Sequence, residues 1–151
     1  MVNFGVHLWA ATSTLLMGVV IVFMDWVPTA FNRNITGMSA RDRLPSTLIH
    51  FTLSVVFATT NVLVVKWFIF AGAVWYSVVL LAAIRNWWLP YLAGVHQGEI
   101  TPHVYLQHYA GNARVLPRFK DHPVIPDVQH MLIHLSVLAA CVLSWWSFGL
   151  A

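Results

Sequence analysis

Two histidines, His130 and His134, lie four positions apart at the start of an apolar segment that begins with Asp127. On an α-helix this spacing puts both imidazoles on the same face, one turn apart. Imidazole and carboxylate groups bind metals, carry protons and form hydrogen bonds, so the pattern is compatible with each of these roles. Ionisable groups inside a membrane segment are costly, which makes a partner or a function for them more plausible.

Small and polar residues also line one helical face of each other apolar segment. The four stripes are His7, Ala11, Thr14, Gly18 and Asp25; Thr47, His50, Ser54, Ala58 and Asn61; Gly72, Tyr76, Ala83 and Asn86; and Asp127, His130, His134 and Cys141. In membranes such residues face other helices rather than lipid. We therefore expect their polar ends to meet in one layer, within about two helical turns of one membrane boundary. The expected members of this layer are Asp25, His50, Asn86, His130 and His134.

Three histidines and a carboxylate form a credible ligand set for a metal ion such as zinc, iron or copper. The predicted metal ligands are His50, His130, His134 and Asp25. Alternatively, His50 and His134 on facing helices could hold a haem iron, or one of them another tetrapyrrole. The residue pattern does not choose between a metal ion and a tetrapyrrole.

A purely structural interpretation of the same residues is also open. Histidines hydrogen-bond across helix bundles, and Asp127 is placed to cap the last helix. Asp25 could form an ion pair with Arg85 or with a loop arginine. Alternatively, Arg85 could reach lipid headgroups. Pro90 clashes with the carbonyl four residues earlier, that of Asn86, and so predicts a kink beside the polar layer.

The composition indicates a membrane protein. Of the 151 residues, 59% are hydrophobic and only 9% charged, whereas about a quarter of a soluble domain is charged. The 8 tryptophans and 9 phenylalanines fit aromatic belts at the membrane interfaces. The single cysteine, Cys141, excludes an internal disulfide and a cysteine-based zinc cluster. The basic residues lie in loops beside apolar segments, so we expect contact with lipid and not with nucleic acid.

Apolar segments and proline positions predict an all-α integral membrane protein with a single transmembrane domain over residues 1–151. We expect a bundle of four transmembrane helices at about 6–27, 45–64, 68–92 and 127–148, with Pro45 in the first turn of the second. The loop at 94–126 is expected to contain a short interfacial helix at about 103–113, introduced by Thr101 and Pro102.

The distribution of basic residues predicts the orientation. The two long loops and the adjoining helix end carry Arg33, Arg41, Arg43, Arg85, Arg114, Arg118 and Lys120, whereas the opposite side holds only Lys66. By the positive-inside rule the two loops are cytoplasmic and both termini are outside. We expect the inner membrane of a bacterium, with the termini in the periplasm.

Three functions fit this pattern. The first is a non-catalytic binding protein or accessory subunit, associated with other membrane subunits or with copies of itself. The second is a histidine- or metal-dependent membrane enzyme, and the third is an oligomeric, proton-coupled transporter. The spacing of His130 and His134 resembles one element of the membrane di-iron desaturases and hydroxylases. That family also has adjacent histidine pairs, which this chain lacks, so a di-iron oxygenase is disfavoured. A dihaem cytochrome b is disfavoured too, because only His7 lies near the outer face.

Overall fold

The computed structural model describes residues 4–151, and those residues form helices joined by turns and loops, without a β-strand. In chain order the elements are α1 (Phe4–Trp26), the 3-10 helix η1 (Arg33–Gly37), α2 (Ala40–Val62), α3 (Lys66–Ala83), the π-helical turn η2 (Ile84–Trp88), α4 (Leu89–Ala93), α5 (Pro102–His108) and α6 (Val128–Leu150). The predicted all-α class is confirmed for this part of the chain.

Three helical segments are long and apolar enough to cross a membrane: Phe4–Trp26, Lys66–Ala93 and Val128–Leu150. Helix α2 is as long as α1, at 23 residues, but it is not among these candidates. It contains the polar residues Arg41, Asp42, Arg43 and His50. A fourth span therefore remains a prediction. Large apolar side chains are exposed on the long helices, among them Trp9, Trp67, Leu81, Leu135 and Trp146, which is compatible with contact to a bilayer.

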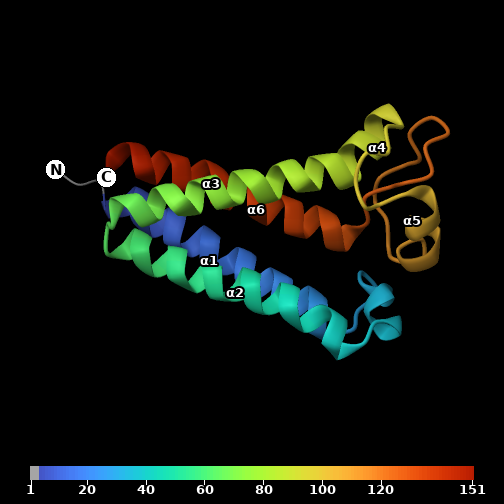
Figure 1. Ribbon diagram of the computed structural model, residues 1–151, viewed down its shortest axis with the longest axis horizontal. Coiled ribbons are helices and arrows are strands. Elements are labelled where there is room, and N and C mark those ends of the chain that lie inside the picture. Colours follow the sequence, from blue (N-terminus) through green and yellow to red (C-terminus); the bar gives the residue numbers. More distant parts are fainter. Residues whose placement is uncertain (1–3) are drawn as a thin grey trace.

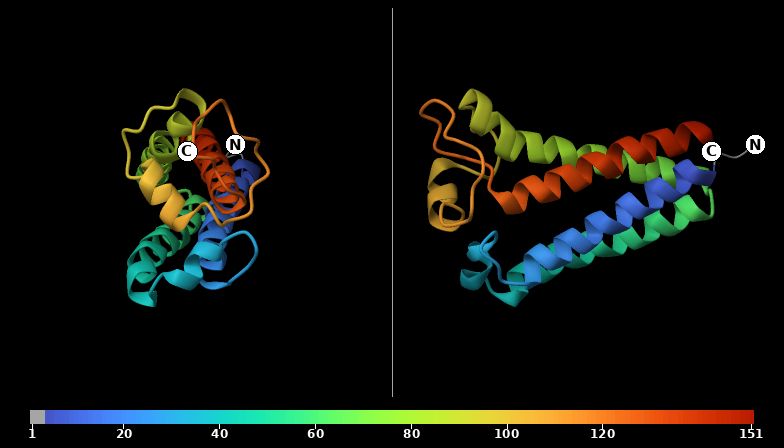
Figure 2. Two further views of the ribbon diagram at one scale, coloured as in Figure 1. Left: turned by 90° about the vertical axis from the view of Figure 1, so that its right-hand side faces the viewer. Right: turned by 180° about the vertical axis from the view of Figure 1, so that it is seen from behind.

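The four long helices lie side by side (Figure 1). Helix α1 packs against α2 and α6, while α3 packs against α6 and α2. The start of α1 and the C-terminus lie at one end, and both long connections lie at the other (Figure 1). Towards the connections the pair α1–α2 diverges from the pair α3–α6 (Figure 2). The end that carries the loops, the loop end below, thus differs in shape from the end that carries the termini.

The centre of the bundle is apolar and closely packed. Its core consists of Met17, Ile21, Phe57, Tyr76, Val137, Ala140 and Cys141. A Cβ atom at Gly18 of α1 would lie 2.7 Å from the Cβ atom of Ser54 on α2, closer than side chains normally approach. The missing side chain therefore lets the backbones of α1 and α2 approach each other, as small residues do between membrane helices.

A buried hydrogen-bond chain joins three helices at the terminal end. His7 Nδ1 lies 2.7 Å from Ser147 Oγ, and the Ser147 hydroxyl donates to Asn61 Oδ1 at 2.6 Å. These three side chains are buried, so His7 points into the bundle near the end that carries the termini. Its position near a membrane face stays a prediction. Each bond offsets the desolvation of groups that have little or no access to solvent.

Helix α2 begins five residues before the predicted position. Ser39 caps it: its hydroxyl accepts from the Asp42 backbone N–H and donates to the Asp42 carboxylate at 2.7 Å. The Ser39 side chain thus satisfies a free backbone N–H of the first turn, which stabilises an earlier start of the helix. Pro45, which was expected in the first turn, consequently lies inside the helix.

The loop helix α5 is shorter than predicted and ends at His108 rather than near residue 113. The segment up to Ala113 does not continue the helix, and Ala113 instead makes backbone hydrogen bonds to other parts of the chain. Its N–H donates to the carbonyl of Ala30, and its carbonyl accepts from Val128 N–H. These bonds join both loops to the start of α6, so the loop end is held together by backbone contacts.

The irregularity expected at Pro90 takes the form of the π-helical turn η2. The Leu89 N–H bonds to the carbonyl of Ile84, five residues earlier, instead of four. Proline lacks an N–H and disturbs the preceding turn, and a π turn accommodates this by widening the helix locally. Trp87 and Trp88 both lie within this turn.

Candidate functional site

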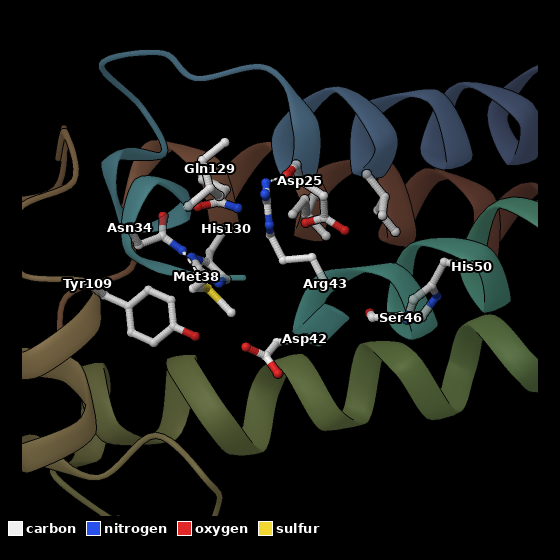
Figure 3. A pocket seen from close by; sticks show the side chains of 13 residues that line it. Asp25, Asn34, Met38, Asp42, Arg43, Ser46, His50, Tyr109, Gln129 and His130 are labelled. Atoms are coloured by element: carbon white, nitrogen blue, oxygen red, sulfur yellow. Dashed lines mark hydrogen bonds between the residues drawn. The ribbon is translucent and has the colours of Figure 1, made fainter. Parts of the chain in front are cut away.

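A polar cavity of about 260 Å³ lies at the loop end between α1, α2 and α6 (Figure 3). It is lined by Ile21, Asp25, Asn34, Ile35, Met38, Asp42, Arg43, Ser46, His50, Tyr109, Gln129, His130 and Ile133. Three members of the predicted polar layer therefore line one cavity, namely Asp25 from α1, His50 from α2 and His130 from α6. We call it the loop-end cavity.

Asp127 fixes the orientation of His130. The buried Asp127 carboxylate caps α6 by accepting from the His130 backbone N–H, as its position predicts, and Oδ1 also lies 2.7 Å from His130 Nδ1. Its Oδ2 accepts from Asn112 Nδ2 at 2.7 Å. An ionised carboxylate only accepts, so His130 Nδ1 carries a proton, and in the neutral ring Nε2 keeps its lone pair. A carboxylate-oriented histidine of this kind can bind a metal or act as a general base.

Aromatic rings enclose the same imidazole. Trp87 stacks on His130 with ring centroids 3.7 Å apart, and Tyr109 meets it edge-on at 5.2 Å. Trp87 is buried in the bundle and does not face its surroundings, because its ring lies inward from the π turn against His130 of α6. The imidazole of His130 is thus held by a carboxylate and two rings.

Asp25 forms the facing wall of the cavity. Its Oδ2 accepts from the Thr47 hydroxyl at 2.5 Å, and its backbone carbonyl accepts from the Arg43 guanidinium. Arg43 also lies over the ring of Trp26, 4.8 Å from the centroid. The expected contact of Asp25 with an arginine is therefore made by Arg43 through the backbone, and not by Arg85.

His50 contributes an incompletely paired imidazole. Its Nδ1 atom is buried without a hydrogen-bond partner, and its ring centroid lies 5.8 Å from that of Trp75. A buried polar atom without a partner is uncommon and is often explained by a bound water or ligand. His50 therefore has hydrogen-bonding capacity that the described chain does not use.

His134 does not line this cavity. It accepts a hydrogen bond at Nδ1 from the indole N–H of Trp88, at 3.2 Å, and lies in a separate groove between α3 and α6. Indole nitrogen can only donate, so Nδ1 is unprotonated and a neutral His134 carries its proton on Nε2. In this arrangement His134 presents a hydrogen-bond donor rather than a lone pair for a metal.

Asn86 and Arg85 also lie outside the cavity, where they fasten the loop that follows α4. Asn86 Oδ1 accepts from the Glu99 backbone N–H at 2.8 Å. Arg85 donates to the carbonyl of Gln97 through Nε at 2.9 Å and Nη2 at 2.5 Å. Both side chains therefore secure the loop to the end of the third long helix.

The predicted four-residue metal set is not assembled. Among residues 4–151, no three histidine, cysteine, aspartate or glutamate side chains lie close enough together to hold a metal ion. Nor do His50 and His134 face each other across one space, as a shared haem would require. The loop-end cavity does offer Asp25, His50 and His130, with room for water or a small molecule between them.

The sequence pattern did not single out Tyr109, Asn112 or Gln129 as parts of the site. Asn112 lies in an irregular loop segment and donates both to Asn34 Oδ1 and to Asp127, so only the folded loop reveals it. Burial raises the pKa of Tyr109, and the carboxylates of Asp127, Glu99 and Asp25 raise it further. Tyr109 therefore keeps its proton at neutral pH and adds a donor to the cavity wall.

The chain matches no protein-family model, no curated protein and no solved structure.

Proposed function

We propose that this chain is a small multi-pass membrane protein that binds a small cation in the loop-end cavity and serves as a non-catalytic accessory subunit. The observation that carries the proposal is the convergence of Asp25, His50 and His130 from three helices on one cavity. The cation is either a hydrated divalent metal ion or a small organic amine, since both carry positive charge and donate hydrogen bonds.

The charges around the cavity favour a cation. Asp25 and Asp42 contribute two negative charges and Arg43 one positive charge, while the lone pair of His130 Nε2 adds an acceptor. Arg43 is engaged with the Asp25 backbone and with Trp26, so its charge does not cap the Asp25 carboxylate directly. Fewer than three of these side chains lie close enough together to bind one metal ion, so water molecules would supply the remaining ligands.

The membrane placement is part of the proposal. Three helices are apolar enough to span, and α2, which packs against α1 and α3, would be the fourth. The loop end carries most of the basic residues, so by the positive-inside rule it faces the cytoplasm of a bacterial inner membrane. The termini would then lie in the periplasm and the cation would enter from the cytoplasm. Exposed apolar helix faces would contact lipid, other membrane subunits or further copies of this chain.

A membrane enzyme is the second candidate, and the Asp127–His130 pair favours it. An imidazole oriented by a buried carboxylate can remove a proton from a bound molecule through Nε2. Tyr109 at the same wall could donate a proton or a hydrogen bond. Proton-coupled transport has less support, since the apolar core around Met17, Phe57 and Val137 separates this cavity from the polar chain at His7.

Titration of the purified protein in lipid nanodiscs tests cation binding. Co²⁺ serves as the metal probe, because its visible spectrum reports the ligands, and ethylammonium serves as the amine probe. Removing a charge-assisted contact costs about 1.5–3 kcal/mol, so Asp25→Asn and His130→Ala should each weaken binding by roughly 10-fold or more. His103→Ala, an exposed histidine on α5, is the matched control and should bind like the wild type.

The two probes separate the two kinds of cation. A visible Co²⁺ spectrum that indicates an imidazole ligand, and that is lost in His130→Ala, would identify a metal site. Saturable ethylammonium binding without cobalt binding would identify an amine site. A haem absorption band in the purified protein, or cation binding that neither variant weakens, would overturn the proposal.

A further inference from the structure

A second cavity, of about 310 Å³, lies between α3 and α6 and shares no residue with the loop-end cavity. Its lining residues are Leu80, Ile84, Trp88, Met131, His134, Leu135 and Leu138. Ile84, Leu135 and Leu138 are partly exposed, so the cavity opens to the surroundings of the bundle. We call it the α3–α6 groove. In a bilayer it would open towards lipid.

One hydrogen-bond donor remains free in this apolar groove. The Trp88 indole N–H is used by His134 Nδ1, which leaves the imidazole proton on Nε2. His134 is only 8% exposed, and its Nε2 has no hydrogen-bond acceptor within residues 4–151. An unpaired N–H in an apolar environment is unfavourable, so an acceptor from outside the chain would be bound with a net gain.

The groove is therefore suited to a ligand that is largely apolar and carries one accessible carbonyl oxygen. We propose that it binds a membrane quinone, whose ring carbonyl accepts from His134 Nε2–H while the ring and tail lie along the indole of Trp88 and the aliphatic side chains. Mostly apolar walls with one placed polar group are typical of sites for such molecules. The inference concerns binding alone; it rests on the proposed membrane placement and not on the proposed cation site.

The depth of His134 favours a quinone over a phospholipid ester. His134 lies seven residues beyond the capping residue Asp127, which corresponds to about 10 Å along the helix. Ester carbonyls of phospholipids lie near the edge of the hydrocarbon layer, whereas a lipid-soluble quinone reaches the interior. A ring that enters sideways from lipid can place its carbonyl at the depth of His134.

Infrared spectroscopy of decylubiquinone labelled with carbon-13 at its ring carbonyls tests the proposal in nanodiscs. A carbonyl that accepts a hydrogen bond shifts its stretching band to lower frequency, so the bound quinone should show a shifted band. His134→Leu should abolish the shift and weaken binding about 3- to 10-fold, the range expected for one neutral hydrogen bond. His134→Gln retains an amide donor and should keep much of the shift.

Two further variants keep the result interpretable. Leu138→Trp fills the groove but leaves the Trp88–His134 pair in place, and it should prevent binding even if His134→Leu misfolds. His103→Leu changes an exposed histidine and should bind like the wild type. An unshifted wild-type band, or a shift that survives in His134→Leu or Leu138→Trp, would overturn the proposal. So would equally tight binding of decylbenzene, which lacks a carbonyl and would reveal simple apolar partitioning.

Discussion

The indole of Trp87 lies on the imidazole of His130, with ring centroids 3.7 Å apart and planes inclined by 29°. The contact joins the π turn before α4 to the first turn of α6. It leaves one edge of the imidazole for Asp127 and the other for the cavity. The orientation of His130 is therefore set by contacts from two distant parts of the chain.

Replacing Trp87 with leucine should remove this stacking and leave a void beside His130. We expect a loss of about 1–3 kcal/mol of unfolding free energy and weaker Co²⁺ binding, because a freer imidazole must be ordered again on binding. Denaturant unfolding in detergent and a cobalt titration measure both effects. Trp67→Leu, at a 72% exposed tryptophan, is the control. Equal losses in the two variants would contradict a specific role for Trp87.

Asp127→Ala should destabilise the start of α6. The change removes the helix cap and leaves His130 Nδ1 without its acceptor, while Asn112 Nδ2 loses one of its acceptors and keeps Asn34 Oδ1. Together these losses should cost about 2–4 kcal/mol. Thermal unfolding followed by circular dichroism measures the loss. Ser39→Ala, which removes the exposed cap of α2, should cost only about 1 kcal/mol. Similar losses in both variants would show that the buried contacts of Asp127 add little.

Tyr109 should make stability fall at alkaline pH. Its pKa in the folded chain is raised above the unfolded value of about 10, so the folded state favours the neutral phenol. This contribution is fully present below about pH 10 and is lost as the pH rises through the folded pKa. Melting temperatures measured between neutral and strongly alkaline pH should therefore decline less steeply for Tyr109→Phe than for the wild type. Parallel curves would contradict the raised pKa.

Gly18→Ala should separate α1 from α2. The new methyl group would collide with Ser54, and relief of that overlap should cost about 1–3 kcal/mol. Gly149→Ala is a matched control, because a Cβ atom there meets nothing within 4 Å. The test compares the unfolding free energies of the two variants in the same detergent. A neutral Gly18→Ala would mean that the two helices can part freely.

Helical periodicity carried much of the prediction. The stripes containing Asp25, His50 and His130 did identify side chains that reach one cavity, because each sits on a face fixed by 3.6 residues per turn. Whether these residues bind a ligand stays a prediction. Asn86 and His134 lie outside the loop-end cavity. Asn86 belongs to the π turn and accepts from Glu99 N–H, while His134 accepts from the indole N–H of Trp88. Periodicity cannot anticipate a partner that lies far along the chain.

Loops were predicted less well for a different reason. Tyr109 reaches the cavity, and Asn112 reaches Asn34 and Asp127 beside it, where Ala113 is tied to Ala30 and Val128 by backbone bonds. Such bonds depend on the three-dimensional path and leave no periodic trace. Pro45 misled the placement of α2 because proline suits a first turn, yet the Ser39–Asp42 capping pair began the helix earlier.

The π turn at Ile84–Trp88 also sets the rotational phase of everything that follows it in the third long helix. One residue corresponds to about 100° of rotation in a regular α-helix. Deleting one residue within the turn would change which side chains face α6 at this level. Trp87 stacks on His130 and Trp88 donates its indole N–H to His134, so both histidines take a partner from this one turn. An insertion or deletion here would therefore alter the surroundings of both histidines at once.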